Sequence, residues 1–150
     1  MQNKNFLIIE SNYYSDISSE LLSGAKSQIS SIGGECEVIN VPGALEIPLC
    51  LSFFINNSKQ FNPEISMYIV LGCIIKGETS HYDHVCFECM HGVQTLAIEN
   101  SLALGNGILT VENKKQAEIR SSINVGNKGK VAVEAAFALW KIKQSITKDL

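Results

Sequence analysis

The residues most suited to catalysis lie within one segment, residues 71–86, where an apolar run gives way to ionisable side chains. The run is typical of a buried strand and stops at Lys76-Gly77, after which an amphipathic helical pattern begins. In open α/β proteins, binding sites form beyond the carboxyl ends of strands, beside helix N-termini. The segment therefore predicts an active site, without specifying its reaction.

His81 is the candidate for proton transfer in this segment. It falls in the first turn of the predicted helix, where the helix dipole and free backbone N–H groups disfavour extra positive charge. A neutral imidazole is thereby favoured, and it can accept or give a proton near pH 7. A surface or capping role is commoner for an isolated histidine, so the residue alone leaves both roles open.

The turn before His81 is suited to an anion. Gly77, Thr79 and Ser80 place a glycine and two hydroxyls beside a helix N-terminus, whose N–H groups can bind phosphate. Lys76 could assist or be solvated, and the spacing is not that of a P-loop. The turn therefore indicates a phosphate site of another type.

The histidines and cysteines near His81 also suggest zinc, because Cys86 and Cys89 form a Cys-x-x-Cys pair. Helical spacing argues against zinc, since both cysteines share the apolar face while His84 and His91 point to the other side. Cysteine often packs as a small buried hydrophobe. The pattern therefore favours core packing of these thiols, and we expect no metal.

Two charged residues elsewhere could bind a ligand. Glu46 lies between Pro42 and Pro48 in a predicted first helical turn, where a carboxylate is electrostatically ordinary but could accept hydrogen bonds from a polyol. Arg120 lies late in another predicted helix and could clamp a phosphate or stay solvated. Spacing alone favours the ordinary role for each residue, a first-turn carboxylate for Glu46 and a solvated side chain for Arg120.

These residues are carried by alternating predicted strands and helices. Strands are expected at 6–9, 36–41, 67–73 and 107–111, and helices at 15–32, 44–57, 80–102, 114–121 and 128–146. Ser15 or Asp16 is expected to cap the first helix, and Gly33-Gly34 to end it. The βαβ order predicts an α/β sandwich with a parallel sheet.

Composition bounds the class of protein. The chain has 150 residues, of which 45% are hydrophobic and 18% charged, so we expect one globular domain, residues 1–150. A net charge of -3 gives no electrostatic reason to expect nucleic acid. The apolar run at 67–75 falls far short of the ~20 residues of a membrane helix. With no signal-peptide pattern and an odd cysteine number, five, we expect a cytoplasmic protein with reduced thiols.

The last predicted helix is apolar on more than one side. One apolar stripe consists of Val131, Ala135, Leu139, Ile142 and Ile146. A second apolar flank consists of Val133, Phe137 and Trp140. Such a helix is usually buried on two sides. We therefore expect a subunit interface here, with a wider intramolecular groove as the alternative.

Four segments, in order, resemble the lumazine synthase family. They are Val41-Pro-Gly-Ala-Leu-Glu-Ile-Pro48, Leu71-Gly-Cys-Ile-Ile-Lys-Gly-Glu-Thr-Ser-His-Tyr-Asp83, Gly107-Ile-Leu-Thr-Val-Glu-Asn113 and Gly126-Asn-Lys-Gly129. The similarity extends from Tyr13 through the final helix. It implies a flavodoxin-like, three-layer αβα sandwich with a four-stranded parallel sheet. It also implies a homopentamer with active sites between adjacent subunits.

The resemblance implies a reaction between two small molecules, 5-amino-6-(D-ribitylamino)uracil and 3,4-dihydroxy-2-butanone 4-phosphate. The products would be 6,7-dimethyl-8-ribityllumazine, phosphate and water, in the penultimate step of riboflavin biosynthesis. No cofactor or metal would be needed. Proton transfer and a held phosphate are the requirements of this chemistry, and both match the residues around His81.

The resemblance also implies a role for individual positions. His81 would transfer protons. The phosphate would be held by Glu78, Thr79 and Arg120. The strand end that lines the pyrimidine would be Cys73, Ile74 and Ile75. The ribityl chain would be bordered by Ala44, Leu45 and Glu46. Tyr13 would be the aromatic residue that stacks on the heterocycle. Asn106 would contribute to the pocket of a neighbouring subunit.

The chain departs from the usual family pattern around the expected pocket. Tyr14 replaces a usual asparagine, Leu45 a frequent phenylalanine and Asn106 a frequent phenylalanine or histidine. Lys76 likewise replaces a frequent arginine. Thinner aromatic walls raise the alternative of a non-catalytic flavin or lumazine binder. The retained His81 favours catalysis, because a binder needs no proton donor beside a phosphate site.

Overall fold

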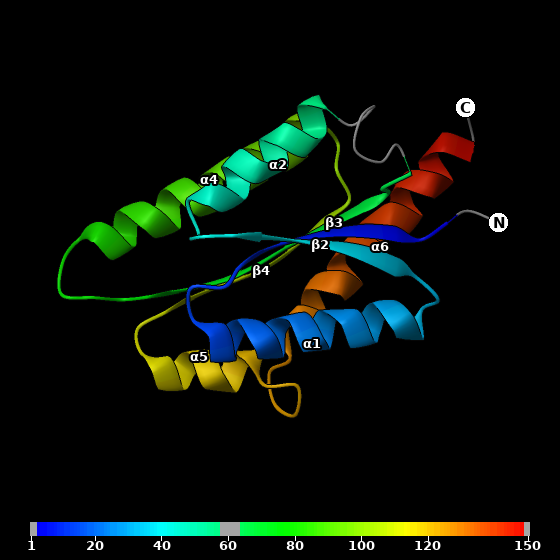
Figure 1. Cartoon of the computed structure of the whole chain (residues 1–150). Helices are drawn as coiled ribbons and strands as arrows, with labels where there is room; N and C mark the ends of the chain where they lie inside the picture. The colour runs from blue at the N-terminus through cyan, green and yellow to red at the C-terminus, as the bar shows by residue number, and fades with distance from the viewer. Residues whose placement is uncertain (1–2, 58–63, 149–150) are drawn as a thin grey trace.

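Four parallel strands form the sheet that positions the predicted site residues (Figure 1). The computed structural model describes residues 3–57 and 64–148. The strands are β1 (Asn5–Ser11), β2 (Glu35–Val41), β3 (Met67–Ile75) and β4 (Leu104–Val111). Their order across the sheet is β2-β1-β3-β4. The two inner strands, β1 and β3, are almost continuously buried, which explains their unbroken apolar runs.

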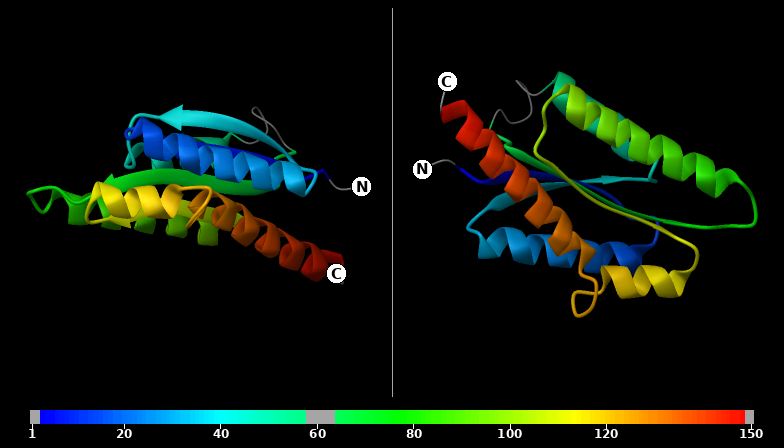
Figure 2. Two further views of the ribbon diagram at one scale, coloured as in Figure 1. Left: turned by 90° about the horizontal axis from the view of Figure 1, so that it is seen from below. Right: turned by 180° about the vertical axis from the view of Figure 1, so that it is seen from behind.

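Helices cover both faces of this sheet (Figures 1 and 2). One face carries α1 (Ser15–Ser31), α5 (Lys114–Ser121) and α6 (Lys128–Lys148), and the other carries α2 (Glu46–Asn56) and α4 (His81–Glu99). The predicted flavodoxin-like, three-layer αβα sandwich with a four-stranded parallel sheet is confirmed. Within the two described ranges, no helix is long and apolar enough to cross a bilayer.

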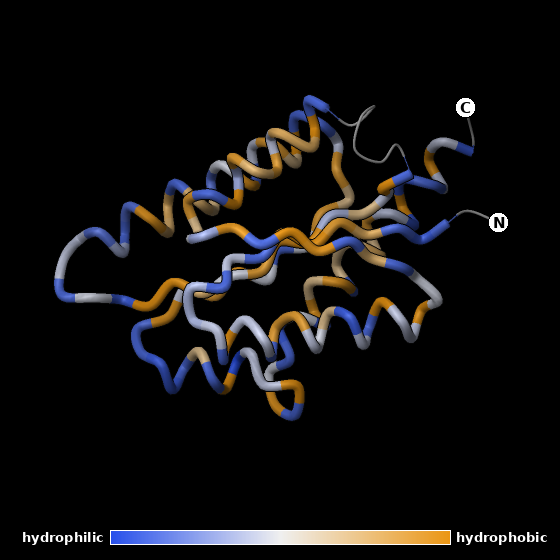
Figure 3. Tube along the Cα trace, in the orientation of Figure 1, coloured by the Kyte–Doolittle hydropathy of each residue, from blue (hydrophilic) through white to orange (hydrophobic). Residues whose placement is uncertain are grey.

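Strand alternation divides the core into two halves. Phe6 and Ile8 of β1 pack on the side of α1 and α6, whereas Leu7 and Ile9 pack on the side of α2 and α4. Figure 3 shows hydrophobic colour gathered along the central strands, with mixed hydrophobic and hydrophilic colour along the helices. Both layers are therefore fixed to the central strands, whose carboxyl ends support the candidate site.

The start of α1 corrects one prediction. Its N-cap residue is Tyr14, without a side-chain capping hydrogen bond, whereas Ser15 or Asp16 was expected. The Asp16 carboxylate instead lies 3.0 Å from the Lys114 ammonium of α5, which joins two helix starts. The predicted helix end is confirmed, because Gly33 has a φ of 72°.

Strand β4 begins at Leu104, whereas the sequence pattern predicted a start at residue 107. Gly105 and Asn106 read as turn residues, but packing places them in the sheet. A side chain at Gly105 would collide with the backbone of Ala132 in α6. The Asn106 Oδ1 atom accepts a hydrogen bond from the Ile108 N–H at 2.9 Å, which holds the amide within the strand.

Helix α6 is apolar on two flanks, as predicted. The flank against the sheet buries Ala132, Val133, Ala136 and Trp140. The stripe with Val131, Leu139, Ile142 and Ile146 faces outward, and these side chains are 43–60% exposed. No groove of this chain therefore covers the stripe within the described residues.

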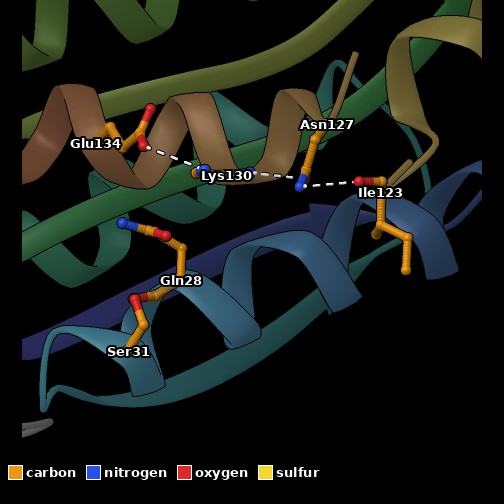
Figure 4. A network of polar contacts seen from close by, with 6 residues as sticks. All are labelled: Gln28, Ser31, Ile123, Asn127, Lys130 and Glu134. Carbon is orange, nitrogen blue, oxygen red and sulfur yellow. Dashed lines mark hydrogen bonds and ion pairs between the residues drawn. The ribbon is translucent and has the colours of Figure 1, made fainter. Parts of the chain in front are cut away.

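The motif 126–129 forms the joint between α5 and α6 (Figure 4). Gly126 lies against the backbone of Arg120, and Asn127 has a φ of 44°. The Asn127 Oδ1 atom accepts a hydrogen bond from the Lys130 N–H at 3.3 Å, in the first turn of α6. Gly129 lies against the backbone of Leu21 in α1. Packing or backbone conformation therefore explains the residue type at three of the four motif positions, Gly126, Asn127 and Gly129.

Candidate active site

A pocket of about 330 Å³ opens at the carboxyl edge of the sheet, beside the N-terminus of α4. Its walls come from the ends of β1 and β3, the turn before α2 and the start of α4. They consist of Ser11, Tyr13, Tyr14, Gly43, Ala44, Leu45, Glu46, Cys73, Ile74, Ile75, Gly77, Thr79, His81, Tyr82 and Val85. Parallel strands bring these distant segments together because all their carboxyl ends meet at one edge.

Most of the predicted site residues line this one pocket. They are Tyr13, Ala44, Leu45, Glu46, Cys73, Ile74, Ile75, Thr79 and His81. Glu78, Asn106 and Arg120 are not part of its lining. The structure thus brings together the residues expected at the pyrimidine, the ribityl chain and the proton-transfer position. It leaves two of the three expected phosphate residues outside.

His81 is the first residue of α4 and is exposed at the pocket. Its backbone N–H donates a hydrogen bond to the Thr79 Oγ1 atom at 3.3 Å, which shapes the turn that leads into the helix. The positive end of the α4 dipole favours an anion. This location places the imidazole beside a seat for a negatively charged substrate group.

Glu46 begins α2 and lies half-buried at the pocket wall. Backbone hydrogen bonds from Glu46 to Gly43 and from Ile47 to Ala44, both 3.2 Å long, form the preceding turn. A Cβ atom added to Gly43 would lie 2.9 Å from the Glu46 Oε2 atom, so the carboxylate folds over this turn. There it can accept hydrogen bonds from ligand hydroxyls.

The pocket thiol, Cys73, is 6% exposed. Burial, with a smaller contribution from Asp16, raises the pKa of this thiol to about 11. Cys73 is therefore neutral near pH 7 and is a poor nucleophile. Its contribution to the pocket is a small apolar wall and the backbone of the strand end.

The cysteines of α4 pack toward the sheet, as the helical spacing predicted. Cys89 is fully buried, and burial raises the pKa of its thiol to about 12. Cys86 packs partly buried against the same half of the core. His84 and His91 lie exposed on the other side of the helix, and the His91 ring stacks on Phe87 with centroids 5.4 Å apart. Over residues 3–57 and 64–148, no three potential ligands gather into a metal site.

Three predicted site residues, Asn106, Arg120 and Glu78, lie outside the pocket lining. Asn106 is half-buried, and its Nδ2 atom lies 3.5 Å from the Met90 sulfur of α4. Arg120 is exposed on α5, where its Nη1 atom donates a hydrogen bond to the Gln116 carbonyl at 3.2 Å. Arg120 thus lies on a helix of the α1 and α6 side and is not part of the pocket lining. Glu78 lies exposed in the turn before α4.

Sequence reasoning missed several residues of the pocket lining. Tyr14, Tyr82 and Val85 are the large ones. Tyr14 directly follows the aromatic residue expected to stack, and Tyr82 and Val85 follow His81 by one and four positions on its helix. These last two lie one helical turn before Cys86 and Cys89, on the same apolar face of the helix. The signal was present, but the first turn of α4 extends beyond the sheet edge and exposes that face to the pocket.

Comparison with known proteins identifies the family. The family model for 6,7-dimethyl-8-ribityllumazine synthase matches residues 3–144. The 6,7-dimethyl-8-ribityllumazine synthase of Methylorubrum extorquens is 42% identical over 93% of this chain and 80% of its own length. The 6,7-dimethyl-8-ribityllumazine synthase 1 of Rhizobium meliloti is 39% identical over 95% of this chain and 93% of its own length. The chain therefore belongs to the 6,7-dimethyl-8-ribityllumazine synthase family.

Proposed function

We propose that this enzyme condenses 5-amino-6-(D-ribitylamino)uracil with 3,4-dihydroxy-2-butanone 4-phosphate to give 6,7-dimethyl-8-ribityllumazine, phosphate and water. One observation carries the proposal beyond family membership. The pocket joins an ionisable imidazole, His81, to a helix N-terminus and to the folded-over carboxylate of Glu46. A proton-transfer group, an anion seat and a polyol partner are the elements that this condensation requires.

The substrates would lie across the pocket in a defined order. The ribityl hydroxyls would meet Glu46, and the pyrimidine would lie on the strand end at residues 73–75 against Tyr13. The phosphate would lie at the α4 N-terminus, held by backbone N–H groups of Glu78 and Thr79. The family resemblance suggests this order, and the chemistry of the pocket walls supports it.

The reaction can then proceed without a cofactor or metal. The substrate amine attacks the ketone, and loss of water gives an imine. Elimination expels the phosphate together with a proton taken from the neighbouring carbon, and ring closure releases a second water. We assign His81 to these proton transfers, because it is the imidazole at the pocket and lies beside the proposed phosphate seat.

We further propose that a second copy of the chain completes the site, in a homopentamer. Two features of this chain support the proposal. The exposed α6 stripe is an apolar surface that has no cover within the described residues. Arg120 lies away from the pocket of its own chain, so a clamp on the phosphate would have to come from a neighbour. One domain, residues 1–150, in the cytoplasm would be the subunit.

Mixing the chain with both substrates tests the proposal. Lumazine fluorescence and inorganic phosphate should rise together, one phosphate for each lumazine. His81→Ala should lower the rate by a factor of ~10²–10⁴. His84→Ala is the matched control, because this exposed histidine of the same helix is not part of the pocket lining and should react as the parent does. A parent chain that binds lumazine and forms none would be a binder instead.

A further inference from the structure

Two neighbouring tyrosines form a corner of the pocket. The rings of Tyr13 and Tyr14 have centroids 5.0 Å apart and planes at 79°, so one ring meets the other edge to face. Both line the pocket, at the loop between β1 and α1. This angle and separation are those of a favourable aromatic pair.

The two rings differ in their support. Tyr13 is 73% exposed and has little around it to hold its ring in one orientation. Tyr14 is half-buried and packs against the core on the side of α1 and α6. Burial, with smaller contributions from Tyr13 and Cys73, raises the pKa of the Tyr14 phenol. The anchored ring thus lies between the core and the exposed ring.

Apart from the two tyrosines, the rings in the pocket lining are His81 and Tyr82, both on the α4 side. Leu45 is aliphatic and 40% exposed, and Asn106 lies outside the pocket lining. A heterocycle beside residues 73–75 that stacks on Tyr13 would depend on the orientation of this exposed ring. An exposed aromatic side chain that must be ordered by its ligand binds more weakly than one that is ordered beforehand.

We propose that Tyr14 is a positioning residue that orients the Tyr13 ring for stacking on the substrate heterocycle. The inference rests on the proposed function, since the heterocycle is that of the pyrimidine substrate and the lumazine product. The Tyr14 ring holds the neighbouring ring through this edge-to-face contact, while its own ring is fixed by the core. Its phenol hydroxyl is not needed for this role.

Binding of 6,7-dimethyl-8-ribityllumazine, measured by fluorescence titration, tests the role. Tyr14→Leu removes the ring but keeps an apolar side chain, and it should weaken lumazine binding roughly 2- to 10-fold. Tyr14→Phe keeps the ring and should bind as the parent does. Tyr14→Met is a second ring-free variant if the leucine variant does not fold. Tyr68→Leu is the control for losing a half-buried tyrosine away from the pocket.

A double-mutant cycle separates positioning from simple packing. In a Tyr13→Leu background, Tyr14→Leu should cost no further affinity, because there is no ring left to orient. Unchanged binding by the ring-free variants, or additive losses in the double variant, would overturn the inference. Those outcomes leave turnover by the parent chain intact. A parent chain that neither binds nor forms lumazine would overturn the proposed function as well.

Discussion

Gly129→Ala is the perturbation that tests most sharply whether the motif 126–129 is structural. Gly129 lies in the first turn of α6, and an added Cβ would collide with the carbonyl oxygen of Leu21 and lie 3.0 Å from the Ala25 nitrogen. Both obstacles are backbone atoms of α1, which cannot rotate away. The two helices would therefore have to separate along their crossing.

The expected loss of stability follows from two opposing effects. Overpacking of this kind costs about 1–3 kcal/mol, and backbone obstacles favour the upper part of this range. Alanine is a better helix former than glycine by up to ~1 kcal/mol, which offsets part of the cost. The net loss should be about 1–2 kcal/mol, equivalent to a fall in Tm of roughly 2–8 °C for a chain of this length.

Gly92→Ala is the matched control, since Gly92 is also a helical glycine. Its added Cβ would lie 3.0 Å and 3.3 Å from side-chain carbons of Pro48, and a shift of a few tenths of an ångström relieves this contact. The gain in helix propensity should then leave stability within about 0.5 kcal/mol of the parent.

Urea unfolding at one protein concentration measures both variants, because the proposed subunit association would make stability depend on concentration. Below the unfolding transition, Gly129→Ala should keep the parent's KM for both substrates. A Gly129→Ala chain as stable as Gly92→Ala, or a stable one with selectively weakened substrate binding, would refute a structural role for the motif.

Three other predictions concern buried polar groups and the proposed phosphate clamp. Burial raises the pKa of Glu10, partly opposed by Lys26, so this carboxyl adds stability below pH 4.5 that is lost as the pH rises through the folded-state pKa. At pH 7, Glu10→Gln should therefore have a free energy of unfolding roughly 1 kcal/mol above that of the parent, and a higher urea midpoint. Equal urea midpoints would contradict this. The Ser11 hydroxyl is buried with no hydrogen-bond partner among the described residues, so Ser11→Ala should stabilise the chain by up to ~1 kcal/mol in thermal unfolding, and a loss would count against it. Arg120→Ala should raise the KM for the butanone phosphate about 10-fold or more and leave that for the pyrimidine within about 2-fold, whereas equal effects on both would exclude the clamp.

The layers of the fold were predictable because hydrophobic periodicity reports burial directly. The inner strands β1 and β3 are buried on both faces, so their apolar runs stood out. The start of β4 was not predictable, because Gly105 and Asn106 resemble a turn. Gly105 is a glycine because α6 approaches its backbone, and that approach depends on tertiary packing.

The pocket was predictable as far as strand ends determine it. Residues 73–75 end one parallel strand, and Glu46 and His81 follow the ends of two parallel strands, so their meeting follows from topology. The contact between Tyr13 and Tyr14 was not predictable, because adjacent residues in a loop can point in any direction. The helix cap was missed because Asp16 bonds across to Lys114, a partner about a hundred positions away.

Mixed oligomers give the most direct test of the central claim, a condensing site shared between two copies of the chain. Chains carrying His81→Ala and chains carrying Arg120→Ala are unfolded together in equal amounts and reassembled. In a cyclic oligomer each site takes one residue from each of two neighbours, so about a quarter of the sites regain both residues. With the butanone phosphate well below the parent's KM, where loss of Arg120 lowers the rate, the mixture should then recover roughly a quarter of the parent's rate of lumazine formation. A mixture no more active than the two variants reassembled separately would contradict the shared site.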